Sequence, residues 1–119
     1  MIVAMPNPTA VTTTAFAACA VANEFLLERV GDRFVASDAR SIFDARAWRC
    51  AVSVAYPGIG EVGEVGEIIV GSHAAEVLSH TPIDEMRRRA RLLYEQHRER
   101  IEAAFARIRH LDDLRDPVV

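Results

Sequence analysis

Residues 48–56 read Trp-Arg-Cys-Ala-Val-Ser-Val-Ala-Tyr, and this stretch decides the fold class. Every second side chain is a larger apolar one, and the residues between are small or polar. That two-residue period is typical of a β-strand with one buried face. Pro57 and Gly58 follow directly and supply the residues of a tight turn. The pattern therefore predicts a half-buried strand with Trp48 and Tyr56 at the two ends of its core face.

Further strands are predicted on both sides. Val65–Val70 has the composition of a second strand, and Glu76–Ser79 that of a shorter strand pairing back. Upstream, Arg33–Ala36 is compatible with a short edge strand. The polar residues that follow, up to Ala47, are typical of a turn into which Phe43 tucks. Because these connections are short, we expect antiparallel hairpins.

An N-terminal helix is predicted over Thr14–Val30, after an irregular segment of residues 1–13 that is rich in proline and threonine. Gly31 follows at once and suits the end of a helix. Apolar spacing predicts that the helix buries one face. The residues assigned to that face are Phe16, Ala20, Leu27 and Val30.

A long helix is predicted to begin at Thr81. The Thr81 hydroxyl and the Asp84 carboxylate have the spacing of a capping box, and Pro82 occupies the first helical position. No glycine or proline follows until Pro117. A single helix reaching Arg109 would be about 40 Å long.

One apolar stripe runs along this predicted helix, at spacings of three and four residues. Its members are Ile83, Met86, Ala90, Leu93, Tyr94, Ile101, Ala104, Phe105, Ile108 and Leu111. A sheet of short strands spans about 20 Å, so the helix is expected to outrun it. Residues 101–111 would then need another partner.

The sequence thus predicts one α+β domain. Residues 14–80 form the N-terminal helix, packed on an antiparallel sheet of three to four strands. Residues 81–111 form the long C-terminal helix of the same domain, and residues 112–119 a flexible tail. A chain of 119 residues has room for one such core.

Composition excludes several classes of function. The net charge of −3 argues against binding nucleic acid or an anionic membrane, and no stretch is apolar enough to span a bilayer. Cys19 and Cys50 lack a CxxC spacing, which favours reduced thiols in a cytoplasmic protein. A disulfide between them is compatible with the sequence but is not required by it.

The candidate ligand motifs favour ordinary structural roles. Residues 58–63 match the dinucleotide-binding pattern GxGxxG, but a β-rich stretch follows where that motif needs a helix. Glu61, Glu64 and Glu67 recur every third residue, so on a regular strand they would alternate faces rather than converge on a cation. No cofactor is expected.

The four histidines, His73, His80, His97 and His110, do not predict a metal site. No two of them have the i, i+4 spacing of helical zinc ligands. His80 with Asp84 and His97 is the set that comes nearest. His97 lies on the apolar stripe, where a partly buried, hydrogen-bonded histidine is the ordinary outcome.

The order of elements resembles the PepSY family of small bacterial α+β domains. The matching residues are Glu67-Ile68-Ile69-Val70 followed by Glu76-Val77-Leu78, within about residues 15–80. Gly71 replaces the family's aspartate, and Ala74-Ala75 replace its Thr-Gly turn. The resemblance implies a binding or inhibitory module rather than an enzyme. The C-terminal helix lies outside it.

We therefore expect a non-enzymatic protein–protein interaction module that uses its C-terminal helix, with a protein partner or as a homodimer. The candidate partner-binding residues are Arg87, Arg88, Arg91, Ile101, Phe105, Ile108 and Leu111. A specific form is a toxin-neutralising protein whose arginines enter an acidic active site. For the arginine cluster, the alternative is ion pairing along the helix, from Asp84, Glu85 and Glu95 to Arg88, Arg89 and Arg91.

The rival class is a cystatin-like domain that binds a small ligand or catalyses a reaction. Its pocket would lie between sheet and helix, lined by Trp48, Tyr56 and His80. The same strand pattern underlies both hypotheses. A large stabilisation by a metal or metabolite in a thermal-shift screen would favour the ligand-binding class.

Overall fold

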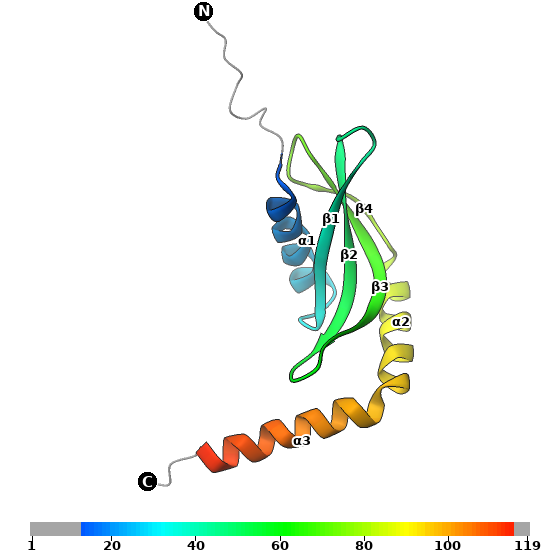
Figure 1. Cartoon of the computed structure of the whole chain (residues 1–119). Coiled ribbons are helices and arrows are strands. Elements are labelled where there is room, and N and C mark those ends of the chain that lie inside the picture. The colour runs from blue at the N-terminus through cyan, green and yellow to red at the C-terminus, as the bar shows by residue number, and fades with distance from the viewer. Residues whose placement is uncertain (1–12, 116–119) are drawn as a thin grey trace, which may run out of the picture.

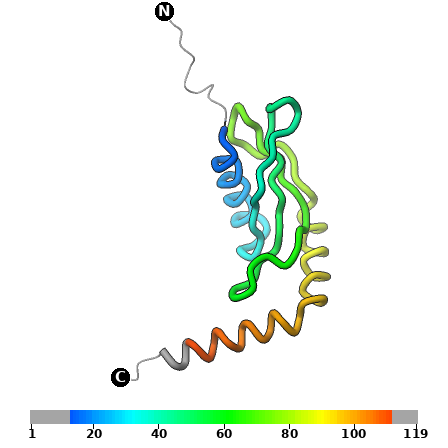
Figure 2. Tube along the Cα trace, viewed as in Figure 1, coloured from blue at the N-terminus to red at the C-terminus, as the bar shows by residue number. Residues whose placement is uncertain are grey.

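The protein is an α+β domain (Figures 1 and 2), as predicted, in a computed structural model that describes residues 13–115 and side chains as far as Leu111. The elements are α1 (Ala15–Arg29), β1 (Phe34–Ile42), β2 (Ala47–Tyr56), β3 (Gly60–Gly71), β4 (Val77–His80), α2 (Ile83–Gln96) and α3 (Arg98–Arg115).

The sheet is antiparallel, with strand order β1-β2-β3-β4. The core face predicted for β2 is confirmed, since Cys50, Val52 and Val54 are buried. The small residues Ala51 and Ser53, on the other face, are buried too, so burial does not alternate along the strand. The three side chains of the core face form one core with α1 residues and with Met86 of α2. Both helices therefore lie on the same face of the sheet, and the other face is left uncovered by them.

Two β-bulges in β3 change the predicted placement of the glutamates. The register skips Val62 and Val65, so Ala51, Ser53 and Ala55 of β2 stand opposite Glu67, Glu64 and Glu61. Those β2 residues are two apart and share one face. The three glutamates consequently share the uncovered face, and the prediction that they alternate faces is wrong. One extra residue per bulge turns a three-residue repeat into a two-residue one.

The first strand is longer than predicted. β1 continues to Ile42, through an irregularity after Ser37, across residues that were expected to form a turn. The turn is confined to residues 43–46, and its Phe43 is 68% exposed instead of tucked inwards. Phe43 to Ala45 adopt positive φ angles of 53–67°, a conformation that bulky residues rarely adopt.

The first helix is one residue shorter at each end than predicted, with Thr14 and Val30 as its caps, and it buries a different face. Thr14 caps it by accepting a hydrogen bond from the amide of Ala17, and the Gly31 amide closes its end by donating to Leu26 O. The buried residues are Ala18, Ala22, Leu26 and Val30, whereas Phe16, Ala20 and Leu27 are exposed. Of the predicted inward face only Val30 is confirmed. Alanines let the helix approach the sheet closely, which the larger side chains would prevent.

Asn23 fixes this orientation. Its side-chain amide donates to Ala36 O at 3.1 Å and accepts from Ala36 N at 2.9 Å. β1 is an edge strand, so the N–H and C=O of Ala36 that point away from β2 have no neighbouring strand to bind. The Asn23 side chain satisfies both groups. Its two hydrogen bonds to the buried Ala36 explain why this polar side chain points towards the sheet.

The chain from Thr81 departs from prediction in two ways. Thr81 does not cap the helix: its hydroxyl accepts from the Glu67 amide at 3.0 Å, and α2 begins at Ile83 with no side-chain cap. The predicted single helix is divided into α2 and α3 at His97, and α3 runs on to Arg115 where a tail was expected from Asp112. Figure 1 shows α3 turning beneath the β2–β3 hairpin.

The division at His97 follows from the stripe. Since its apolar side chains lie along one side of a continuous helix, a bend towards that side folds the second half back onto the end of the sheet. His97 has φ −115° and ψ 18°, outside the helical region, and its amide is shared between Leu93 O and Tyr94 O. The free energy gained by burying apolar surface offsets the loss of helical hydrogen bonds at the bend.

We predict that Asn23→Ala lowers the free energy of unfolding by about 2–3 kcal/mol, because it leaves the buried N–H and C=O of Ala36 unpaired. The neighbouring Glu24 is exposed, so Glu24→Ala should change it by less than about 0.5 kcal/mol. Urea denaturation of both variants makes the comparison. Equal, small effects would show that Asn23 does not hold α1 on β1.

Candidate functional site

The three residues predicted to line a sheet–helix pocket are not brought together. The indole of Trp48 donates to Thr13 O at 2.8 Å, at one end of β2. Tyr56, at the other end, packs near the rings of Tyr94 and Phe105. His80 lies on β4, with its ring 4.7 Å from that of Phe25. The three side chains therefore serve three separate packing contacts and line no common cavity.

The glycine-rich stretch forms the β2–β3 turn and the first part of β3. A strand follows it, where a dinucleotide site would need a helix N-terminus. Among residues 13–115, no group of three histidine, cysteine or acidic side chains is placed to hold a metal ion. The proximity suggested for His80, Asp84 and His97 is not observed.

The two cysteines are free thiols in contact across the α1–β2 interface. Burial raises the pKa of Cys50 to about 12, and the neighbouring Cys19 adds to the effect. Since the thiolate is the reactive form, Cys50 is held in its unreactive state at neutral pH. Cys50 therefore packs in the core as a small apolar side chain.

The uncovered sheet face carries an acidic row that is partly neutralised. Arg49 lies on this face and binds Glu67 at 2.6 Å and Glu64 at 2.8 Å. These hydrogen bonds raise the pKa of Arg49. Glu61, the third member of the row, makes no ion pair in the part of the chain whose side chains are described. The row therefore forms a solvated salt-bridge network in which Glu61 is the carboxylate without an ion-pair partner among the described side chains.

The arginine cluster of α2 is largely engaged within the chain. Arg87 donates to Arg29 O and Val30 O, the free carbonyls at the end of α1, at 3.4 and 3.3 Å. Arg88 and Arg89 both bind Glu85, at 2.6 and 2.7 Å. Hydrogen bonds from Arg88 and then Arg89 lower the pKa of Glu85 to about 2.

The alternative reading of this cluster, ion pairing along the helix, thus holds for Glu85. Asp84 and Arg91 make no such pair among the described side chains, and Glu95 pairs with Arg98 at 3.2 Å instead. Arg91 is exposed and stays available to a partner. Arg87 and Arg88 already have partners of their own.

The first two turns of α3 are docked on the domain. Ile101 and Ala104 are buried, and a Cβ atom placed on Gly58 would lie 3.4 Å from Ala104 Cβ. The Arg33 guanidinium lies over the rings of both Phe105 and Tyr56, at 5.0 and 5.2 Å. Of the predicted partner-binding residues, Ile101 is thus covered by its own chain, and Phe105 is half-buried.

The distal part of α3 is more open. Ile108 is half-buried, with its Cδ1 close to Gly58, while Leu111 is 56% exposed. We call residues 106–111, which follow the docked turns, the distal arm. It contains Arg107 and Arg109 and no acidic residue, and neither arginine is ion-paired within the described side chains.

A groove runs between the distal arm and the β2–β3 turn. It has a volume of about 310 Å³ and is lined by Gly58, Ile59, Arg100, Ala103 and Arg107. Two arginines seven residues apart lie two turns apart on the same side of a helix. The seven-residue spacing of Arg100 and Arg107 is visible in the sequence. The position of this pair beside a turn depended on the bend at His97, which the sequence did not reveal.

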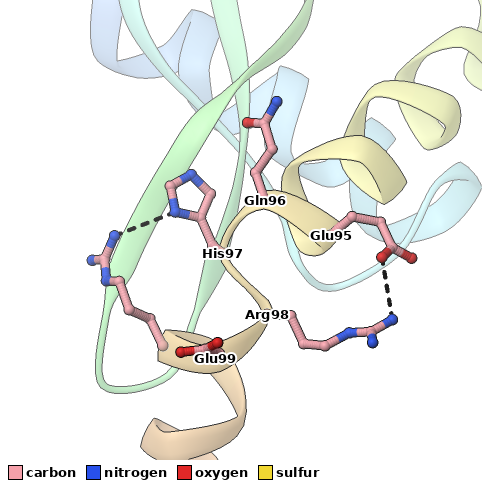
Figure 3. A pocket seen from close by; sticks show the side chains of 6 residues that line it. Glu95, Gln96, His97, Arg98 and Glu99 are labelled. Carbon is pink, nitrogen blue, oxygen red and sulfur yellow. Dashed lines mark hydrogen bonds and ion pairs between the residues drawn. The ribbon is translucent and has the colours of Figure 1, made fainter.

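The elbow between α2 and α3 holds a second, larger cavity of about 460 Å³, lined by residues 95–100 (Figure 3). Arg98 reaches back to Glu95, and Arg100 approaches the ring of His97 at 3.4 Å. Across the elbow, Tyr94 Oη donates to Glu102 Oε2 at 3.0 Å. That hydrogen bond raises the pKa of Tyr94.

No family model, curated protein or solved structure matches the chain. The PepSY resemblance accordingly stays a prediction. No helix in the described part of the chain is long and apolar enough to cross a membrane.

We predict that Ile101→Ala costs about 2–5 kcal/mol of unfolding free energy, as for other fully buried large-to-small changes. Leu111→Ala should cost less than about 0.5 kcal/mol, because Leu111 contributes little to the packed surface. Chemical denaturation of the two variants tests the division of α3 into docked and open parts. Comparable losses of unfolding free energy in the two variants would contradict a boundary between docked and open parts that lies between Ile101 and Leu111.

Proposed function

We propose that the protein is a non-enzymatic protein-binding module whose distal arm, residues 106–111, contacts an acidic surface of another protein. The observation that carries this proposal is the combination of Arg100 and Arg107 beside one groove with the exposed side chain of Leu111 on the same helix. Apolar and arginine side chains together are typical of the centre of protein interfaces.

The charge of the distal arm supports an acidic partner. Arg107 has no acidic residue three or four positions away, whereas Arg109 has Asp112 and Asp113 at those spacings. Arg107 is therefore the arginine of the arm that is left to a partner. A partner carboxylate that enters the groove could take paired hydrogen bonds from a guanidinium, which are stronger than neutral ones. Opposite charges at the rim would also speed the encounter.

A narrower proposal follows from the same charges. In it the partner is a toxin with an acidic active site, such as a nuclease, and the arginines of the distal arm enter that site and block it. Arg91 on α2 is also exposed and is a further arginine available to an acidic partner. Regulation of an acidic protein that is not a toxin is the broader case.

A photo-cross-linking amino acid at position 111 tests the broader proposal in the cells that naturally make the protein. We expect an adduct with another protein at this position. The matched control places the same group at Ala106, which is exposed on the outer side of the same helix, and should give at least about tenfold less adduct. Equal adducts, or none at position 111, would contradict the proposal.

The identity of the cross-linked protein also distinguishes the toxin proposal from the broader proposal. Mass spectrometry that identifies a nuclease supports the toxin proposal, and any other partner removes it. With the purified partner, Arg107→Glu should weaken binding about tenfold or more by placing like charges together. Arg40→Glu is the control, because Arg40 lies on β1 and is already paired with Asp38.

A further inference from the structure

The elbow between α2 and α3 is a junction of one residue. Only His97 separates the two helices, and residues 95–99 include neither glycine nor proline. Glutamate, glutamine and arginine favour helix, so the local sequence prefers a continuous helix to a bend. The bend is therefore maintained by contacts made elsewhere.

The bend has a cost in backbone hydrogen bonds. In a continuous helix the amides of residues 98–100 would donate to the carbonyls of residues 94–96. Among the described backbone bonds at the elbow, the amides of His97 and Ile101 are engaged, and none runs from residues 98–100 back to α2. Straightening would restore these bonds.

The contacts that maintain the bend are of two kinds. One is the docking of Ala104 against the turn at Gly58 and of Phe105 against the Tyr56–Arg33 pair, together with the burial of Ile101. The other is the Tyr94–Glu102 hydrogen bond across the elbow. The two residues are eight apart, which is about 12 Å along a straight helix, so that bond belongs to the bent form.

We propose that α3 exchanges between two copies of this chain. In the exchanged dimer, α2 and α3 form one continuous helix, and α3 of each copy docks on the β2–β3 turn of the other. In the monomer and in the exchanged dimer the same helix packs on the same turn. The surfaces that fit together within one chain therefore also fit together between two chains. The proposal goes beyond binding by the distal arm, because it concerns the docked turns of α3 instead.

Physical reasoning favours exchange at this junction. The contacts of the docked turns are the same in both forms and do not decide between them. The dimer recovers backbone hydrogen bonds at the elbow and loses two Tyr94–Glu102 bonds and the freedom of two separate chains. A short hinge under strain is the circumstance that promotes exchange of an element.

A cysteine pair divided between two chains tests the exchange. One chain carries Gly58→Cys and the other, of different mass, carries Ala104→Cys. These positions are close enough for a disulfide, since a Cβ on Gly58 lies 3.4 Å from Ala104 Cβ. The chains are mixed, refolded together from urea and oxidised. We expect a disulfide-linked heterodimer, with the linked peptides identified by mass spectrometry.

Two matched controls accompany the experiment. In the first, Gly60→Cys replaces Gly58→Cys. Gly60 lies in the same hairpin and has a similar φ of +91°, but a Cβ atom placed on it would have no contact within 4 Å. Gly60→Cys should give no heterodimer with Ala104→Cys. In the second control both Gly58→Cys and Ala104→Cys are in one chain, which should link to itself in the monomer.

The outcomes are decisive. A heterodimer with position 58 but not with position 60 supports exchange. No heterodimer, although the double variant links within itself, overturns exchange and leaves the binding proposal untouched. Equal yields at positions 58 and 60 also overturn it, as does failure of the double variant to link, since the docking contact would then be absent.

The bond across the elbow supplies a second readout. Glu102→Gln in one of the two chains weakens one bond to Tyr94 and should raise the heterodimer yield about fivefold, the factor for one hydrogen bond. Glu99→Gln is the matched control, because Glu99 lies on the exposed side of the same helix turn and should leave the yield unchanged. An unchanged yield for both variants would overturn the role of the elbow in the exchange.

Discussion

The layout of the C-terminal half depends on one contact, between the α3 face that carries Ala104 and the turn at Gly58. The sheet is covered by helices on one face, and α2 follows β3 only as far as Leu93, which lies against Gly63. Beyond that point the end of the core, around Tyr56, is still open. A helix that bends at His97 covers it, and a straight helix would not.

The fold class could be predicted because it follows from local periods. The two-residue alternation of β2 and the breaks at Gly31 and Pro57 fix where elements begin and end. The buried face of α1 could not be predicted in this way. Apolar residues occur all round that helix, and its orientation is set by Asn23, which binds the edge of β1. The bulges in β3 depended likewise on pairing with β2, which local sequence does not encode.

The candidate site could be predicted only in outline. The stripe of α3 and its arginines were visible as a pattern, but the pattern did not say which residues the chain itself would cover. Ile101 turned out to be buried and Arg87 to hold the end of α1. What is left for a partner is smaller than the sequence suggested: Leu111, part of Ile108, and the arginines at the groove. The absence of proline and glycine at residues 95–99 predicted a straight helix, because helix propensity is a local quantity and docking on the turn is not.

The central claim is that α3 folds back at His97 and rests on the β2–β3 turn. Nuclear Overhauser effects of the isotope-labelled protein test it most directly. The account predicts a strong effect between the α-protons of Gly58 and the methyl group of Ala104, and an interrupted helical pattern at residues 97–100. An unbroken helical pattern from Leu93 to Ile101, with no effect between Gly58 and Ala104, would contradict it.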